Sequence, residues 1–205
     1  MTAFLLLGLV ILFSILNPLI PVQYGGSLVC GKTRKGYVKC PPADPDSWSS
    51  YLGKPVLIVG KKHCGLQCSG TKGRVVGVGG NERAAKFDCK AKGDPLIIRK
   101  RGGRYYIEAK NYGCALEWSG RKGGNRPVGR NERVAKFDCG GSKGDPMYIS
   151  GKPSKFYLRS KAGGRICGFE WSGLTGNAPG VASYERLAKF DCGNSRGDPL
   201  YVTRA

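Results

Sequence analysis

The sequence predicts an all-β domain built from three repeated units of four strands, with disulfides inside each unit. Three observations lead to this fold class. The segment Glu-Arg-x-Ala-Lys-Phe-Asp-Cys occurs three times, a Gly-Asp-Pro turn follows each copy, and paired cysteines recur at a constant spacing. Short runs rich in β-branched and aromatic residues alternate with Gly, Pro and Asp, and no helical period is present beyond the N-terminal segment.

The N-terminal segment, residues 1–26, carries no charged side chain and is apolar over residues 3–20 apart from two polar positions. Such a run predicts a cleaved signal peptide. A transmembrane anchor is the alternative, because the run is about long enough to span a bilayer, although Pro18 interrupts its end. We therefore expect a secreted, extracellular protein, and nine cysteines suit that oxidising compartment.

A basic arm and a linker rich in Pro and Ser follow the leader, over residues 27–53. The repeated domain is expected over residues 54–205, with units of about 54–103, 104–153 and 154–205. A domain of ~150 residues buries a substantial core, so its stability need not depend on disulfides alone.

The cysteines of each unit define a register for its central hairpin. In every unit one cysteine precedes another by 25 residues (89 − 64 in the first), and opposite positions of an antiparallel pair have a constant sum. In the second unit this sum places Leu116 opposite Phe137 and Glu117 opposite Lys136, so one face is apolar and the other pairs acid with base. We expect the Glu–Lys pairs to be exposed and to contribute about 0–1 kcal/mol each. The predicted disulfides are Cys64–Cys89, Cys114–Cys139 and Cys167–Cys192.

The order of these segments resembles the β-trefoil superfamily. The Glu-Arg-x-Ala-Lys-Phe-Asp stretch is similar to the third strand of fascin-like and fibroblast-growth-factor-like trefoils, and the turn and strand that follow keep a similar order. The resemblance covers residues 55–205 and implies a six-stranded barrel capped by three hairpins. A three-bladed propeller is the alternative, although blade counts that low are rare.

Three cysteines remain outside these pairs. The simplest assignment joins Cys30 to Cys40 in the arm and leaves Cys68 unpaired, whereas in the alternative Cys68 links the arm to the domain and frees another thiol. An odd thiol in a secreted chain raises the prospect of a covalent homodimer. No CxxC spacing occurs and His63 is the only histidine, so we expect no metal site and no cofactor.

The acidic and basic residues are distributed differently along the units. Most acidic residues recur at equivalent positions, which indicates a structural role, and the Asp of each Gly-Asp-Pro turn is expected to accept backbone N–H groups rather than bind a metal. Among the basic residues only six recur, and the rest are irregularly placed. The recurring six are Arg83, Arg133, Arg186, Lys86, Lys136 and Lys189.

The irregular basic residues form two dense clusters, one in the turn between the first two units and one in the hairpin loop of the second unit. The net charge of +20 implies attraction to acidic polymers or surfaces. The equivalent loop of the third unit, residues 174–183, has no basic residue, so the charge is asymmetric. The candidate polyanion-binding residues are Arg99, Lys100, Arg101, Arg104, Arg121, Lys122, Arg126 and Arg130.

The sequence therefore predicts a non-catalytic protein that binds an acidic glycan, or silica or another mineral surface in an extracellular matrix or skeleton. One histidine and no visible nucleophile–base pair argue against an enzyme. A sugar-binding lectin is the alternative, with Trp118 and Trp171 as stacking platforms, but the register places both in the core and the Gln-x-Trp motif of ricin-type trefoils is absent. An antimicrobial or toxin role and a growth-factor-like role stay open as minor alternatives.

Overall fold

The computed structural model of the chain describes residues 46–205, apart from positions 125, 163, 177, 194 and 195, and the backbone of three short strands before them. The chain divides into two compact units, Met1–Asp44 and Pro45–Ala205. The predicted leader falls largely outside the described residues, and so do the side chains of Cys30 and Cys40. The first unit contains a three-stranded sheet of β1 (Gln23–Tyr24), β2 (Ser27–Thr33) and β3 (Gly36–Lys39).

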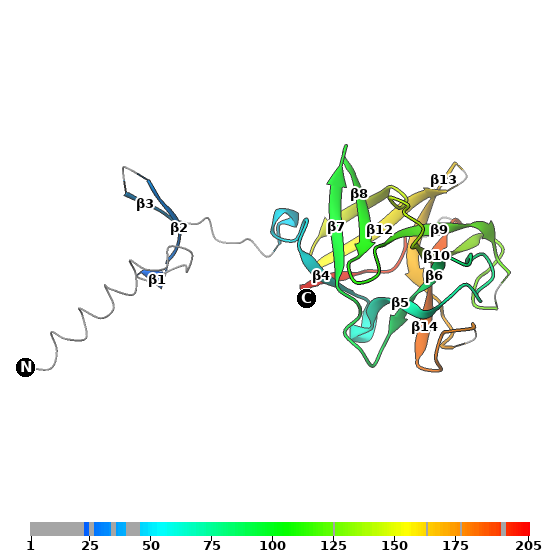
Figure 1. The fold of residues 1–205 in the computed structure, drawn as a ribbon. Coiled ribbons are helices and arrows are strands. Elements are labelled where there is room, and N and C mark those ends of the chain that lie inside the picture. The colour runs from blue at the N-terminus through cyan, green and yellow to red at the C-terminus, as the bar shows by residue number, and fades with distance from the viewer. Residues whose placement is uncertain are drawn as a thin grey trace, which may run out of the picture. The chain divides into compact units, whose positions relative to one another are not determined.

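The second unit is a 12-stranded antiparallel sheet, β4 to β15, with two short 3₁₀ turns (Figure 1). The turns are η1 (Trp48–Ser50) and η2 (Lys61–His63). The strands of its first half are β4 (Pro55–Val59), β5 (Gly65–Lys72), β6 (Glu82–Asp88), β7 (Leu96–Arg101), β8 (Arg104–Ala109) and β9 (Cys114–Lys122). Those of its second half are β10 (Glu132–Asp138), β11 (Met147–Lys152), β12 (Lys155–Ala162), β13 (Arg165–Trp171), β14 (Glu185–Asp191) and β15 (Tyr201–Arg204).

These strands form a closed antiparallel β-barrel, and the prediction of a β-trefoil made of three four-stranded repeats is wrong. Pairing continues across the expected unit boundaries: β7 pairs with β8, β11 with β12, and β15 returns to β4. Strands β6, β10 and β14 also pair with one another. Because an unpaired strand edge exposes a row of backbone N–H and C=O groups, this mutual pairing closes the sheet where separate units would leave edges.

The segment before β4 packs onto the barrel. The indole N–H of Trp48 donates to the carbonyl of Gly151 at 2.9 Å, and its ring meets Phe156 edge-on with centroids 5.1 Å apart. Asp46 pairs with Lys152 at 3.4 Å. The barrel unit thus includes residues that the sequence analysis assigns to the linker.

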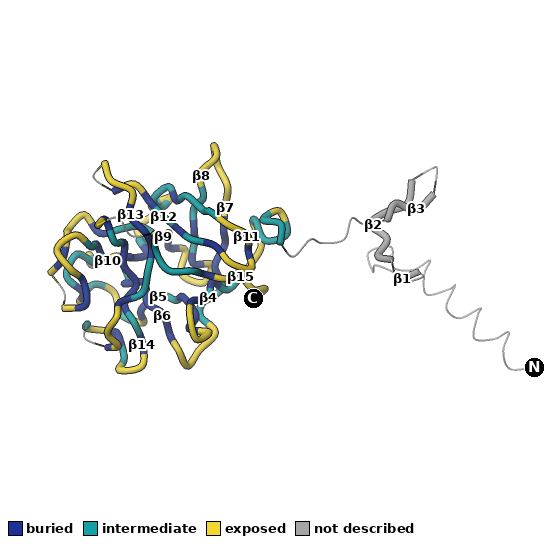
Figure 2. Tube along the Cα trace, turned by 180° about the vertical axis from the view of Figure 1, so that it is seen from behind, coloured by how far each residue is buried: buried dark blue, intermediate teal, exposed yellow. Residues whose placement is uncertain are grey.

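The core follows from the alternation of side chains along the strands, which buries one apolar set in the barrel. Figure 2 shows the buried stretches along the strands and the exposed stretches in the loops. Its largest fully buried side chains are five phenylalanines, Phe87, Phe137, Phe156, Phe169 and Phe190. A second, smaller apolar cluster lies where the strands β6, β10 and β14 meet and combines strand residues with loop valines. Its buried members are Val75, Ala84, Val128, Val134, Val181 and Leu187.

The hairpin register predicted from cysteine spacing is confirmed. In the β9–β10 hairpin Leu116 pairs with Phe137 and Glu117 with Lys136, and the β5–β6 and β13–β14 hairpins have the equivalent pairs. In this register the two cysteines at the base of each hairpin lie side by side and form a disulfide between residues 25 positions apart. The structure forms the three disulfides Cys64–Cys89, Cys114–Cys139 and Cys167–Cys192.

Candidate functional site

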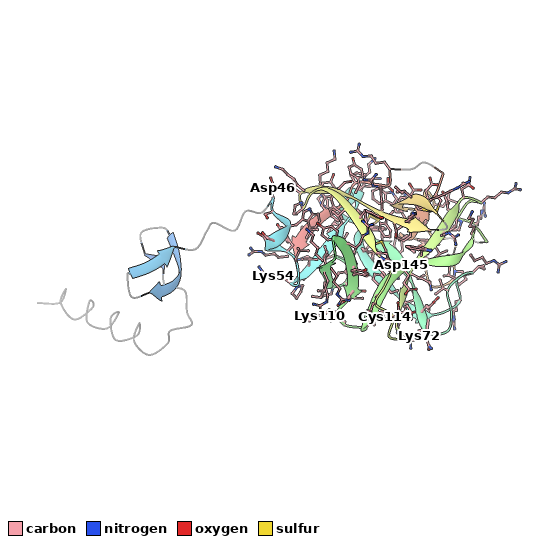
Figure 3. The ribbon with its side chains drawn as sticks, turned by 90° about the horizontal axis from the view of Figure 1, so that it is seen from above. Asp46, Lys54, Lys72, Lys110, Cys114 and Asp145 are labelled. Atoms are coloured by element: carbon pink, nitrogen blue, oxygen red, sulfur yellow. A yellow bond between two sulfur atoms is a disulfide. The ribbon has the colours of Figure 1, made fainter. Side chains whose placement is uncertain are left out.

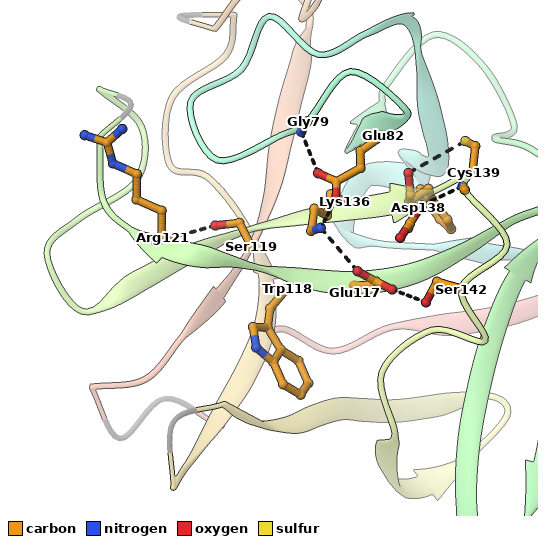
Figure 4. Close-up of polar contacts among 12 residues, drawn as sticks. Gly79, Glu82, Glu117, Trp118, Ser119, Arg121, Lys136, Asp138, Cys139 and Ser142 are labelled. Carbon is orange, nitrogen blue, oxygen red and sulfur yellow. Dashed lines mark hydrogen bonds and ion pairs between the residues drawn. The ribbon is translucent and has the colours of Figure 1, made fainter.

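Three recurring lysines bind carboxylates inside the barrel wall instead of facing solvent. Figure 4 shows Lys136 between Glu82 of the neighbouring hairpin and Glu117 of its own hairpin, the latter at 3.2 Å. The equivalent contacts are those of Lys189 with Glu132 and Glu170 and of Lys86 with Glu185. Strands β6, β10 and β14 are therefore linked in a ring, each lysine reaching a glutamate of the next strand.

The prediction that the Glu–Lys pairs are exposed is wrong. The side chain of Lys136 is 10% exposed and that of Glu117 is 15% exposed. Burial opposes the charged form of Lys136, but the hydrogen bonds that it donates to Glu82 and Glu117 raise its pKa above the ordinary value. The lysine thus stays positive, and the ion pairs act as buried cross-links.

These clusters also contain the only groups of three acidic side chains, within the described residues, whose oxygens lie close enough together to consider a cation. One group is Glu82, Glu117 and Asp138, and the other is its equivalent in the next hairpin. An ammonium group already lies between the two glutamates of each group. We therefore assign a structural role to these carboxylates.

The three recurring arginines have backbone partners. Arg83 donates through one guanidinium nitrogen to the carbonyls of Ser69 and Gly70, at 2.9 and 2.7 Å. Arg133 and Arg186 make the equivalent bonds to the Ser-Gly pairs that begin the other two loops. These arginines brace the hairpin loops, so all six recurring basic residues have structural roles.

The aspartate of each Gly-Asp-Pro turn accepts a backbone N–H from the central hairpin, as the sequence suggests. Asp94, Asp145 and Asp198 accept from Cys68, Trp118 and Trp171, at 2.8, 3.0 and 3.1 Å. Burial raises the pKa of Asp145 to about 6, although the bond from Trp118 opposes the shift. Burial also raises the pKa of Asp198.

The replacement Asp145→Asn should stabilise the barrel relative to wild type, and this gain in the free energy of unfolding should be larger at pH 8 than at pH 4. Asp145 binds a proton more readily in the folded chain than in the unfolded chain. Its ionisation therefore lowers the free energy of unfolding as pH rises from 3.8 to about 6, and above about pH 6 it causes no further change with pH. The asparagine oxygen keeps the acceptor for Trp118 without the charge. We expect a gain on the order of 1 kcal/mol at pH 8, modest because water still reaches the half-buried carboxylate.

Urea unfolding of both proteins at pH 4 and pH 8 measures this difference. The control Asp145→Ala also removes the charge but leaves the Trp118 N–H unpaired, so it should show the same pH dependence as Asp145→Asn and be about 1 kcal/mol less stable than that variant at both pH values. A difference between wild type and Asp145→Asn that is independent of pH would contradict the raised pKa.

The two kinds of charge are exposed very differently. Among the described residues each Asp and Glu is buried or half-buried as a whole residue, although the side chain of Asp46 is 42% exposed. Of the described Lys and Arg, all are exposed except the six recurring residues and Arg159. Figure 3 shows the long nitrogen-tipped side chains directed away from the barrel, with Lys54, Lys72 and Lys110 at its edge. The solvent therefore meets a surface whose charge is almost entirely positive.

The predicted binding residues fall into two groups that the structure does not bring together. Four lie on the β7–β8 hairpin and four on the end of β9 and the loop before β10, and these regions occupy separate parts of the barrel in Figures 1 and 2. On the hairpin, Arg99 and Arg101 bond to Glu108 at 2.7 and 3.4 Å. Lys100 and Arg104 have no ion-pair partner among the described residues.

Sequence reasoning missed two arginines, Arg159 and Arg196, that lie beside tyrosines near this hairpin. Arg104, a predicted residue, lies over the ring of Tyr148 at 4.0 Å, and Arg196 lies over Tyr157 at 4.2 Å. Arg159 pairs with Tyr148 across β11 and β12. Neither Arg159 nor Arg196 belongs to a basic run, and the available signal is the Tyr-x-Arg alternation of β12.

The two tryptophans considered as sugar platforms pack toward the core. The ring of Trp171 meets Phe87 edge-on at 5.6 Å, and that of Trp118 meets Phe190 edge-on at 6.4 Å. Both are partly buried against the main core. This packing accounts for their recurrence without a ligand.

Cys68, the cysteine that replaces a tryptophan in the first hairpin, is buried and only 4% exposed. Burial raises the pKa of its thiol, so the reactive thiolate is disfavoured. We therefore do not expect this cysteine to join two folded chains covalently.

Fold and surface together define a disulfide-braced, all-β barrel with a strongly basic exterior. No known family's sequence profile and no curated protein sequence matches the chain. Several solved structures have similar folds, among them two of low sequence identity. A salivary protein of the Cysteine and Tryptophan-Rich (CWRC) family from the mosquito Culex has 15% identity, a TM-score of 0.49, and coverage of 76% of this chain and 96% of its own. A Caenorhabditis elegans protein of unknown function has 14% identity, a TM-score of 0.50, and coverage of 75% and 94%.

These likenesses concern the fold alone. The resemblance to fascin-like or fibroblast-growth-factor-like trefoils is wrong, as is the β-trefoil fold class that it implied. Within the described part of the chain, no helix is both long and apolar enough to cross a bilayer.

Proposed function

We propose that the protein is a secreted, non-catalytic binder of acidic polymers or surfaces. The barrel carries its cations outward and its carboxylates inward, and this separation is the observation on which the proposal rests. An anionic chain approaching such a surface meets attraction with almost no exposed carboxylate to oppose it. The disulfides are compatible with an oxidising, extracellular setting.

Inward placement of the acids strengthens the argument from net charge. A protein of +20 could still alternate exposed acids and bases and present a mixed surface. Here the described carboxylates other than Asp46 and Glu108 bond to buried lysines, as Glu82 does, or to backbone N–H groups, as Asp94 does. The positive excess is therefore concentrated where a partner binds.

The experiment is the salt concentration that elutes the full chain from immobilised heparin, from a plain sulfonate exchanger and from silica particles. We expect strong retention on all three at low salt and affinity that falls steeply as salt rises, because binding releases counterions. That law is measured for nucleic acids and is extended here to other polyanions. A neutral sugar should not elute the protein.

Comparing elution from the three materials distinguishes a sulfated glycan from a mineral surface as the ligand. Elution from heparin at clearly higher salt than from sulfonate supports a sulfated glycan, whereas equal elution with strong retention on silica supports a general polycation acting on a mineral. Weak retention on all three materials would overturn the proposal.

A further inference from the structure

One face of the barrel carries arginines and tyrosines in cross-strand rows. It spans β7, β8, β11 and β12, which are consecutive neighbours in the sheet (Figure 2), and Arg196 reaches it from the segment before β15 by lying over Tyr157. We call it the Arg/Tyr face. Its members are Arg99, Arg101, Arg104, Tyr106, Tyr148, Tyr157, Arg159 and Arg196.

Strand alternation directs these tyrosines outward. Each follows or precedes a side chain that is fully buried in the core: Tyr106 adjoins Ile107, and Tyr148 adjoins Met147. Successive side chains of a strand point to opposite faces, so the tyrosines lie on the outer face and are half-buried there. The same alternation places Tyr157 outside.

A single row of the face crosses four strands. Arg101 pairs with Arg104 across β7 and β8, and Tyr148 pairs with Arg159 across β11 and β12. Arg104 over the Tyr148 ring joins the two halves. Neighbouring strands lie ~4.8 Å apart, so the row places three arginines and one tyrosine side by side across four strands.

Apart from Arg101, which bonds to Glu108, the arginines of this row have no carboxylate partner among the described residues. Across the described residues, no carboxylate pairs with Arg104, Arg159 or Arg196, and Glu108 pairs only with Arg99 and Arg101. Like charges directly opposite each other, as in Arg101 and Arg104, are unfavourable. The Nε of Arg159 is buried and has no hydrogen-bond partner. An anion held across the row would relieve the repulsion and bond to the guanidinium groups.

The rings serve as supports for the guanidinium groups. Arg101, Arg104 and Arg196 cover Tyr106, Tyr148 and Tyr157 at 5.5, 4.0 and 4.2 Å. A guanidinium group held against an aromatic face is fixed in orientation and still presents its N–H edge. Because arginines already cover these rings, a nucleic-acid base would have to displace them to stack.

We propose that the Arg/Tyr face binds a sulfated polysaccharide laid across strands β7, β8, β11 and β12. Sulfate oxygens accept the paired N–H groups of arginine, in the manner of other planar anion contacts. The open sheet surface suits an extended chain. The proposal rests on the proposed function and assigns it a site, and that site differs from the loop before β10.

Two variants with equal charge test the site. Arg104→Gln/Arg159→Gln/Arg196→Gln removes three charges from the face, and the control Arg121→Gln/Arg126→Gln/Arg130→Gln removes three from the loop. At about 0.15 M salt the face variant should bind heparin at least about tenfold more weakly than the control, while both lose equal retention on sulfonate. Circular dichroism and thermal unfolding establish that each variant is folded.

If the triple variant does not fold, a single substitution at Arg104 still tests whether the Arg/Tyr face binds heparin. Arg104 is exposed, and Arg104→Gln alone should lower heparin affinity about threefold. Tyr148→Phe, which keeps the ring, should match wild type, and Tyr148→Leu should resemble Arg104→Gln.

The outcomes separate the site from the proposed function. Equal losses for the face and loop variants on heparin would overturn the site and leave the proposed function standing. Failure of wild type to bind heparin, sulfonate and silica would remove both. Competition by desulfated heparin, or by single-stranded DNA as strongly as by heparin, would overturn sulfated polysaccharide as the ligand.

Discussion

Replacing Lys136 by methionine should destabilise the barrel by about 3–5 kcal/mol. The ammonium group neutralises Glu82 and Glu117, and its side chain is 10% exposed. Without it, two carboxylates from different hairpins face each other in a poorly hydrated site. Removing one partner of a buried ion pair has a cost of this size because the remaining charge is uncompensated. Urea unfolding at pH 7 with the disulfides intact measures the loss.

Lys86→Met provides a matched control on the equivalent position of β6. Lys86 bonds to Glu185 at 2.5 Å, and Gln67 stands where the other hairpins have a glutamate. Only one carboxylate is then left without its ammonium partner, so the loss should be clearly smaller. Adding Glu82→Gln and Glu117→Gln to Lys136→Met should recover a large part of the stability. A loss below 1 kcal/mol for Lys136→Met would show that the pair behaves like a surface ion pair.

The register of each hairpin could be predicted because its information is local. Two cysteines with a constant separation fix which residues are opposite, and the alternation of apolar and charged residues then checks the register. Leu116 and Phe137 fall on one face and Glu117 and Lys136 on the other, as the structure has them. All the residues that determine this register lie between two cysteines that are 25 residues apart.

The closure of the barrel could not be predicted in the same way. Closure depends on the pairing of β6, β10 and β14 with one another. The sequence of a strand does not indicate which distant strand it will pair with. For this reason the sequence predicts one acidic partner for Lys136, Glu117, whereas the second partner, Glu82, lies 54 residues away in the chain. The burial of the ion pairs follows from that contact, so it was missed as well.

The candidate site shows the same division. Recurrence identified the carboxylates and six basic residues as structural, and the structure gives each group a partner in the barrel. The exposed arginines could be found only where they were adjacent in sequence. Arg159 and Arg196 reach the Arg/Tyr face from separate segments, and only strand pairing places them beside Tyr148 and Tyr157.

Replacing Phe169 by alanine should remove about 3–5 kcal/mol of stability, the range for deleting a fully buried aromatic side chain. The ring of Phe169 is central to the aromatic core, with its centroid 5.8 Å from that of Phe87 and 5.1 Å from that of Phe190. These two rings in turn contact Trp171 and Trp118. The loss therefore includes ring–ring contacts with the first hairpin, through Phe87, and within the third, through Phe190, as well as transfer of the side chain from water.

The cavity itself offers a second measurement. Phe169→Leu keeps most of the volume and should cost about 1–2 kcal/mol, which separates the cavity from the loss of a ring. An apolar cavity of this kind stays dry and binds small aromatic molecules. Benzene should then raise the unfolding temperature of Phe169→Ala and leave that of wild type unchanged. Equal stability of the alanine and leucine variants, with no response to benzene, would mean that the neighbouring rings collapse into the space and that the core is less rigidly packed than its five buried phenylalanines indicate.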